Sequence, residues 1–442
     1  MPSVTTIMNP KLSFIVFLIL TFYTANAQEN SPFSRYGLGD VYPSQNVINR
    51  AMGNISSTYA NGQSVNLGNP AAYSELKIVT YDIGVALDTR SLKSANPVLK
   101  YNSVNLTPSY VALGMPLSKK HNLGLAFGLK PLSRVSYSIQ DNKRIYGDSI
   151  NYLYEGDGGL YQAFVGIGKR WGGLRIGINT GYMFGTKQNS TITTPVDSVS
   201  TYTSNSQTLT TFNKIFFNAG LQYDAMLSKT TTLRFGFSGN LKQKLNAQQQ
   251  INRETITYDA NGSMQKVDSI YQPQEKAGKI EFPLSYAAGI SLNSSVIDHL
   301  GNKFEKSILA VEYETTKWAD YRFFDQPDKL INSWQFKVGG QLTPNPLSIK
   351  SYWDRVNYRA GFYYGKEALN VEGNELPVYA LTLGAGLPIR KWRSFDNQYT
   401  IINTAIEIGK RGNKNNNITE SFFRLSFGLN LSDIWFIKRK YE

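Results

Sequence analysis

The chain contains no cysteine and only two histidines, His121 and His299, among its 442 residues. Without cysteine it can form neither a disulfide bond nor the lipid anchor of an exported lipoprotein. Nucleophilic catalysis and zinc binding most often use cysteine or histidine, so both kinds of site lose their usual residues. The composition therefore predicts that the chain is no enzyme and holds neither a metal ion nor a cofactor.

Long apolar segments are equally scarce. The longest is the run of thirteen residues that follows Lys11, whereas a transmembrane helix needs about twenty. A positive charge, an apolar run and the small residues Ala25-Asn26-Ala27 come in the order of an export signal with its cleavage site. Residues 1–27 are therefore predicted to be a signal peptide, and the start of translation stays open between Met1 and Met8.

Runs of one charge sign are also missing, although the formal net charge is +14. The basic residues are scattered along the sequence, whereas nucleic-acid binding needs a basic patch or stripe. We therefore expect no nucleic-acid partner. Attraction to anionic lipid head groups is a simpler account of the charge.

Alternation of apolar with polar or small residues is what the sequence has in abundance. It recurs in segments of about ten residues, which is the pattern of a transmembrane β-strand with one face on lipid. Residues 421–431 are typical, because Phe423, Leu425, Phe427 and Leu429 alternate with polar or small residues. The fourteen segments are residues 78–88, 107–117, 122–130, 160–168, 174–185, 214–225, 231–242, 282–292, 307–317, 332–342, 355–364, 377–387, 400–410 and 421–431.

A soluble β-sandwich is the alternative for any one of these segments, since alternation also describes a half-buried strand. Fourteen apolar stripes, however, leave no polar outer face for water unless the sheet closes within lipid. The 28 tyrosines and 23 phenylalanines fit the aromatic girdles of such a barrel. We predict an all-β fold, a membrane-spanning antiparallel β-barrel of about fourteen strands over residues 77–442, in the bacterial outer membrane and in contact with its lipid.

The connections predict the orientation of this barrel. Short turns follow the even strands, whereas long polar segments at residues 186–213 and 243–281 follow odd ones. Bacterial barrels have short periplasmic turns and longer external loops, so the two polar segments are expected to be external loops. One periplasmic connection, residues 293–306, is long for this topology. His121 and His299 both fall in periplasmic connections.

Residues 28–76 lack alternation but contain many apolar and aromatic residues. Since fourteen strands enclose more space than their own side chains fill, this segment is expected to be a hatch inside the lumen. By strand parity, five acidic and five basic side chains point into the same lumen. They are Asp82, Asp88, Arg175, Arg234, Glu312, Glu314, Lys337, Arg359, Glu407 and Arg424. A salt-bridged lining around the hatch is the simpler interpretation, and a selective polar path is the alternative.

Two short motifs in the hatch carry a resemblance to a known family. Arg50-Ala51-Met52-Gly53 and Asn69-Pro70-Ala71 resemble the N-terminal pattern of the FadL-like long-chain fatty-acid transporter family of outer-membrane barrels. Asn54 stands where that family has a second glycine. Further segments are similar to the same family, and the first of them to its Bacteroidota lineage: residues 31–40, 282–289, 316–321 and 358–362.

The resemblance implies a fourteen-stranded barrel, an N-terminal hatch and passive uptake of hydrophobic or amphipathic small molecules. It also implies that the hatch motif residues Arg50, Met52, Gly53, Asn69 and Pro70 belong to the functional site. Some relatives instead partner protein-secretion machinery. The alternative is therefore a structural barrel that transports nothing and binds an envelope or protein-secretion complex.

Overall fold

The computed structural model describes residues 31–43, 45–197, 202–259, 261, 263–371, 373–390 and 399–433. The expected signal peptide, its cleavage site and residues 391–398, which connect the predicted strands 377–387 and 400–410, lie outside these residues. No helix within the described ranges is long and apolar enough to cross a membrane.

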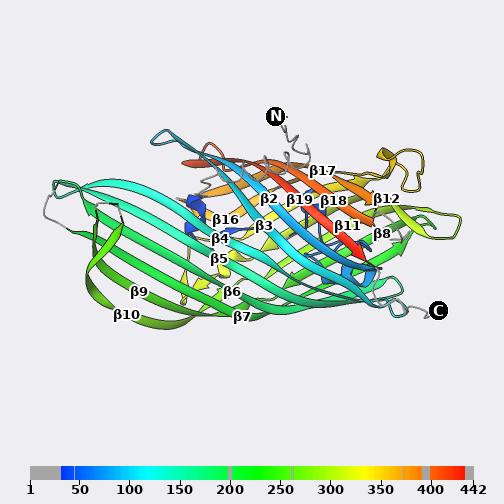
Figure 1. Cartoon of the computed structure of the whole chain (residues 1–442), viewed down its shortest axis with the longest axis horizontal. Coiled ribbons are helices and arrows are strands. Elements are labelled where there is room, and N and C mark those ends of the chain that lie inside the picture. Colours follow the sequence, from blue (N-terminus) through cyan, green and yellow to red (C-terminus); the bar gives the residue numbers. More distant parts are fainter. Residues whose placement is uncertain are drawn as a thin grey trace, which may run out of the picture.

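One antiparallel sheet closes on itself into a barrel of fourteen strands, as predicted from the alternation (Figure 1). Closure comes from the last strand, β19, which pairs with the first, β2, so that Asp433 lies opposite Val79 and Ile418 opposite Ser94. The strands up to β9 are β2 (Val79–Ser94), β3 (Leu99–Ser118), β4 (Leu123–Ile145), β5 (Asp148–Trp171), β6 (Leu174–Pro195), β7 (Thr203–Met226), β8 (Thr231–Asn240) and β9 (Gln243–Tyr258). The others are β10 (Met264–Phe282), β11 (Ser285–Ile297), β12 (Lys303–Thr316), β15 (Ser333–Leu342), β16 (Asn357–Val371), β17 (Asn374–Arg390), β18 (Tyr399–Arg411) and β19 (Ile418–Asp433).

Two of the fourteen barrel strands are interrupted. One of these barrel strands consists of β8 followed by β9, and its neighbour consists of β10 followed by β11. The first half of β7 therefore pairs with β9 and its second half with β8. Side-chain amides replace backbone hydrogen bonds at the interruption. Asn240 Nδ2 donates to the Pro283 carbonyl at 3.0 Å, and the Gln243 amide both donates to and accepts from the Phe217 backbone.

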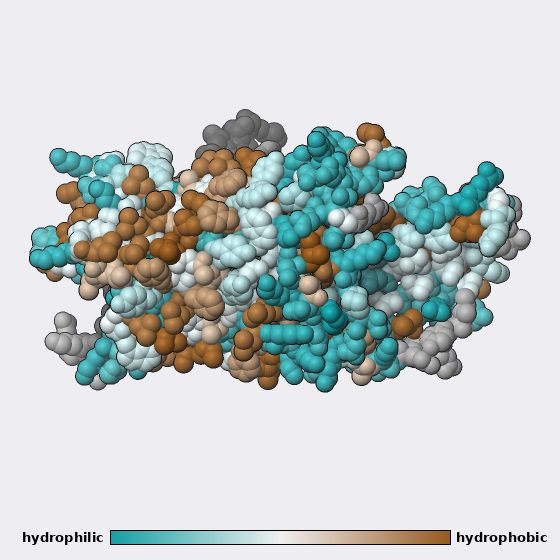
Figure 2. Space-filling model, turned by 180° about the vertical axis from the view of Figure 1, so that it is seen from behind, coloured by the Kyte–Doolittle hydropathy of each residue, from teal (hydrophilic) through white to brown (hydrophobic). Residues whose placement is uncertain are grey.

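The alternation sorts side chains between lipid and lumen. On β2, Tyr81, Ile83 and Val85 are exposed on the outer wall, whereas Asp82 and Asp88 are buried inside. Figure 2 shows apolar residues gathered over one half of the molecule, while the other half is mostly hydrophilic. The apolar half is the one that carries the short connections, which we call the turn end.

The two polar segments that were expected to be external loops are strands. Residues 186–195 and 203–213 continue the β6–β7 ladder as far as the pair Thr193 and Ser204, and most residues of the range 243–281 belong to β9 and β10. Strands β4 to β7, β9 and β10 therefore extend beyond the rest of the barrel, at what we call the projecting end (Figure 1). Apolar alternation stops there because neither face meets lipid, yet backbone pairing needs no apolar side chain. The turn expected at residues 293–306 is also shorter, since β11 ends at Ile297 and β12 begins at Lys303.

The N-terminal residues form short elements inside the barrel, and the remaining short elements lie in connections. Strand β1 pairs with β4, which places Asp40 opposite Arg134. The elements inside the barrel are the 3-10 helices η1 (Pro32–Arg35) and η2 (Pro70–Glu75), strand β1 (Asp40–Val41) and helix α2 (Val47–Arg50). Those in connections are η3 (Trp318–Asp320), β13 (Arg322–Phe323), β14 (Gln326–Pro327) and η4 (Trp353–Arg355).

Candidate functional site

Helix α2 of the hatch has a polar N-terminal cap. The side chain of Asn46 accepts a hydrogen bond from the Asn49 amide at 3.0 Å, which caps α2 at its N-terminus. Arg50 at the end of this helix is buried. Its guanidinium donates to the carbonyls of Pro43 and Gln45 and to the wall hydroxyls of Ser109 and Ser426, and it pairs with no carboxylate among the residues that the structure describes. Arg50 therefore orders the hatch backbone and joins it to the wall.

Met52 and Gly53 follow within the same turn. Met52 packs in an apolar cluster that also contains wall residues Ile308 and Ala310 of β12. Gly53 has φ +69°, and a Cβ there would meet the Val338 carbonyl at 2.9 Å, so glycine is needed on both counts. The next residue, Asn54, also has a positive φ, 65°, which asparagine tolerates better than most residues.

Asn69 and Pro70 start η2, the 3-10 helix that precedes the first barrel strand. Asn69 Oδ1 accepts from the Ala71 amide at 3.0 Å, while its Nδ2 donates to the Ser57 carbonyl at 2.6 Å. Pro70 fills the first helical position, where its missing N–H costs nothing. The motif thus ties two stretches of hatch together at the point where the chain turns toward β2.

A ring of wall glycines surrounds the hatch. At each of them a Cβ would lie closer than 3.0 Å to a hatch atom, so any side chain would displace the hatch. They come from successive strands around most of the barrel: Gly114, Gly124, Gly168, Gly177, Gly220, Gly236, Gly289, Gly339, Gly361 and Gly384. The hatch and the wall are complementary in shape along this ring.

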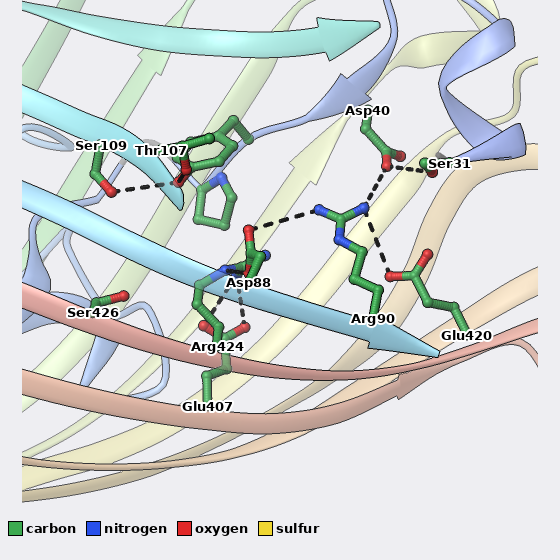
Figure 3. Close-up of polar contacts among 12 residues, drawn as sticks. Ser31, Asp40, Asp88, Arg90, Thr107, Ser109, Glu407, Glu420, Arg424 and Ser426 are labelled. Atoms are coloured by element: carbon green, nitrogen blue, oxygen red, sulfur yellow. Dashed lines mark hydrogen bonds and ion pairs between the residues drawn. The ribbon is translucent and has the colours of Figure 1, made fainter. Parts of the chain in front are cut away.

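Asp40 joins the start of the hatch to two strands, and Figure 3 shows its contacts with Arg90 and Ser31. Its carboxylate lies 3.0 Å from Arg90 of β2 and 3.0 Å from Arg411 of β18, and it accepts a hydrogen bond from Ser31. Burial by itself would raise the pKa of Asp40, but the charges of Arg411 and Arg90 outweigh burial and hold that pKa well below its usual range. Arg411 also contacts Glu367 and Glu420.

A second group of ion pairs links three neighbouring strands of the wall, β2, β18 and β19. Arg424 of β19 contacts Asp88 of β2 and, at 3.2 Å, Glu407 of β18 (Figure 3). Tyr363 donates its hydroxyl proton to Glu407. These groups link neighbouring strands rather than line an open passage.

Glu75 fixes the other end of the hatch. It lies 2.9 Å from Arg175, which is itself 2.7 Å from Asp224, and Asp224 is 2.6 Å from Arg234. Arg234 also donates to the Thr58 carbonyl of the hatch. The hatch is therefore held by a carboxylate near each of its two ends.

The middle of the hatch is held by wall charges that contact its backbone. Glu312 accepts from the Ser56 and Ser57 amides at 2.8 and 2.6 Å. Lys337 lies 3.0 Å from Glu312, contacts Glu314 as well, and donates to the Asn54 carbonyl. These wall groups bind main-chain atoms, so they fix the path of the hatch.

Two of the lumen charges expected from the sequence have no charged partner in the described residues. Asp82 accepts from the Val65 amide at 3.1 Å, and Arg359 donates to Gln341 and Asn403 at 2.7 and 2.8 Å. The strand parity did not single out several charged residues that join these networks: Asp40, Glu75, Arg90, Asp224, Glu367, Arg411 and Glu420. Arg90, Arg411 and Glu420 share the parity of Asp88, Glu407 and Arg424, so longer strands would have included them.

A cavity of about 350 Å³ remains in the lumen. It lies between the hatch, mainly residues 36–43, and side chains from most of the barrel strands, with Tyr36, Phe216 and Trp318 among its lining residues. Its lining mixes aromatic, polar and charged side chains. No residue of a connection at the turn end, in the described ranges, lines it.

Comparison of the sequence with known proteins gives a family match. The BamG family model matches residues 8–442. No curated protein sequence matches the chain.

Solved structures with the same fold are FadL-like outer-membrane channels. The toluene transporter TodX of Pseudomonas putida has a TM-score of 0.54 at 14% identity, over 89% of this chain and 99% of its own. The toluene transporter TbuX of Ralstonia pickettii has 0.53 at 14% identity, over 90% and 99%. A FadL homologue of Pseudomonas aeruginosa has 0.53 at 12% identity, over 89% and 99%. The predicted outer-membrane barrel is confirmed, and the matched families are not enzymes.

Proposed function

The chain belongs to the BamG family, and from this membership we propose that it is an accessory barrel that associates with the Bam complex and transports nothing itself. The sequence alone favoured passive uptake of hydrophobic compounds and kept the structural barrel as the alternative. The family match supports the alternative.

The close fit between hatch and barrel supports the proposal that the protein transports nothing. Opening a path would separate the hatch from the glycine ring and break the buried pairs of Asp40 and Glu75. Breaking one buried ion pair typically costs about 3–5 kcal/mol. Together these contacts favour a hatch that stays in place.

Co-purification tests the proposed association. An affinity-tagged copy extracted from native membranes in mild detergent is expected to enrich identified Bam subunits in fixed ratio. A tagged, unrelated outer-membrane barrel of similar abundance is the control. Absence of every Bam subunit from the tagged sample, or equal amounts in the control, would overturn the proposal.

Uptake of hydrophobic small molecules is the second candidate function, because the lumen contains the 350 Å³ cavity with aromatic lining. Full-length protein in liposomes, assayed with toluene and with a long-chain fatty acid, separates the two candidates. The structural barrel should give the permeability of empty liposomes. Saturable uptake of either compound would establish transport instead.

A further inference from the structure

The two ends of the barrel differ in surface charge, although the basic residues are scattered along the sequence. In the described residues, every charged residue that is exposed at the turn end is a lysine, whereas the other charged residues there are half-buried or buried. The seven are Lys77, Lys119, Lys120, Lys229, Lys303, Lys306 and Lys350. Nine of the described acidic residues at the projecting end are exposed among the basic ones: Asp148, Asp157, Asp197, Asp259, Asp268, Glu275, Asp320, Asp325 and Glu375.

The hydrogen bonds and ion pairs of the acidic groups at the turn end go to residues other than these lysines. Glu305, on the inner face of β12, accepts a hydrogen bond from Gln341 at 2.9 Å. Glu75 contacts Arg170 and Arg175, and Asp298 accepts hydrogen bonds within its own turn. Asp354 accepts from Ser348 at 2.9 Å. None of the seven lysines forms an ion pair within the described ranges, so their charge faces solvent.

One ordered connection stands out at the same end. Residues 343–356, between β15 and β16, form the longest connection of the turn end in the described part of the chain. Asn345 donates its amide proton to the Asp354 carbonyl at 2.8 Å, which closes the connection into a defined loop. Ile349 lies in this loop beside Lys350, and its side chain is 95% exposed.

We propose that the turn end is a docking face for a folded periplasmic protein subunit with an acidic surface, which receives Ile349 and pairs with the surrounding lysines. The inference rests on the proposed function and adds to it the face through which the Bam complex would be contacted. Short turns of bacterial barrels face the periplasm, so such a subunit can reach this end. Opposite charges on two surfaces speed their association and exclude other partners.

A protein partner fits these residues better than lipid head groups do. Tyr358 on the outer wall donates to the Trp353 carbonyl, which places Trp353 next to the lipid-facing surface, as in an aromatic girdle. Ile349 and Lys350 lie in the same loop, four and three residues before Trp353. Lys119, Lys120 and Lys229 likewise lie in turns between strands rather than on the lipid-facing wall.

Charge reversal tests the docking face. The variant K119E/K120E/K229E/K350E is compared with K93E/K100E/K329E/K414E, which makes the same charge change at the projecting end. Both should reach the membrane and show the heat-modifiable migration of a folded barrel. The turn-end variant should capture Bam subunits at about one tenth of the wild-type amount or less, whereas the control variant should capture the wild-type amount. Capture by the wild type should weaken between about 0.05 and 0.5 M NaCl, as salt screens the charges.

Site-specific crosslinking identifies the partner. A photoreactive residue at Ile349 should crosslink to an acidic surface of one identified Bam subunit, whereas one at Val98, 86% exposed at the projecting end, should not. Equal capture by both charge variants would overturn the docking face and leave the proposed function intact. Failure of the wild type to capture any Bam subunit would overturn both. Loss of affinity only for vesicles containing phosphatidylglycerol, with Bam capture retained, would assign the lysines to lipid and also overturn the inference.

Discussion

Asp40 shows how a single carboxylate joins parts of the chain that are far apart in sequence. It connects the start of the hatch to β2 through Arg90 and to β18 through Arg411. All three side chains are nearly buried, so solvent screens their attraction little. Removing the carboxylate would leave two buried cations with fewer partners.

Asp40→Asn should therefore weaken the attachment of the N-terminal part of the hatch by about 3–5 kcal/mol. The measurement is the rate at which added protease cleaves residues 31–43 of the folded barrel in detergent, against urea concentration. Asp141→Asn is the control, because its partner Lys143 is exposed and such pairs contribute about 1 kcal/mol or less. Equal effects of the two substitutions would contradict the role assigned to Asp40.

The glycine ring gives a second prediction at the residue scale. Gly289→Val should destabilise the folded barrel by about 1–3 kcal/mol, because a Cβ there would lie 2.6 Å from Ser57 Oγ of the hatch. Ala288→Val, the neighbouring residue on the outer wall, should change stability little. The stability of both variants is measured as the temperature at which the folded barrel unfolds and changes its migration on a gel. An unchanged temperature for Gly289→Val would mean that the hatch does not press on the wall at this strand.

The strands illustrate at the scale of the element what the alternation could and could not reveal. Each of the fourteen predicted segments falls on a strand, because the lipid-facing stretch requires an apolar side chain at every second position. The polar extensions of β6, β7, β9 and β10 lack this alternation, because their outer face meets water rather than lipid, and the sequence therefore predicts loops there. Stopping the strands early also hid Arg90 and Arg411, which lie just past the apolar stretch.

The orientation of these elements can be tested because the chain lacks cysteine. Asn261→Cys at the tip of β9–β10 should react with a membrane-impermeant maleimide on intact cells. His121→Cys in the turn between β3 and β4 should react only after the outer membrane is permeabilised. Labelling of His121→Cys alone on intact cells would invert the topology.

At the scale of the whole molecule, the hatch decides whether the lumen is open. Its backbone is held by Glu312, Lys337 and Arg234, and its ends by Asp40 and Glu75. The cavity that remains lies beside the N-terminal part of the hatch. We therefore expect that the hatch keeps the lumen closed in the resting state.

Deleting residues 31–66 should therefore raise the conductance of single barrels in planar bilayers well above that of the full-length protein. The strands pair with one another independently of the hatch, so the deleted form should still fold and show heat-modifiable migration. Full-length protein purified in parallel is the control. Unchanged conductance in a folded deletion variant would show that residues 31–66 do not block the lumen.

The sequence by itself determined the barrel, its number of strands, which side chains face lipid and which segment has the composition of a hatch. These follow from periodicity, a local property that lipid enforces on every strand. Only the tertiary structure decided that Asp40 meets Arg411, that ten wall glycines match the hatch, and that seven lysines gather at one end. The reason is closure of the sheet. Closure brings the connections after every second strand to the same end of the barrel. It also places strands that are far apart in sequence around one hatch. Neither of these relations produces a periodic pattern in the sequence.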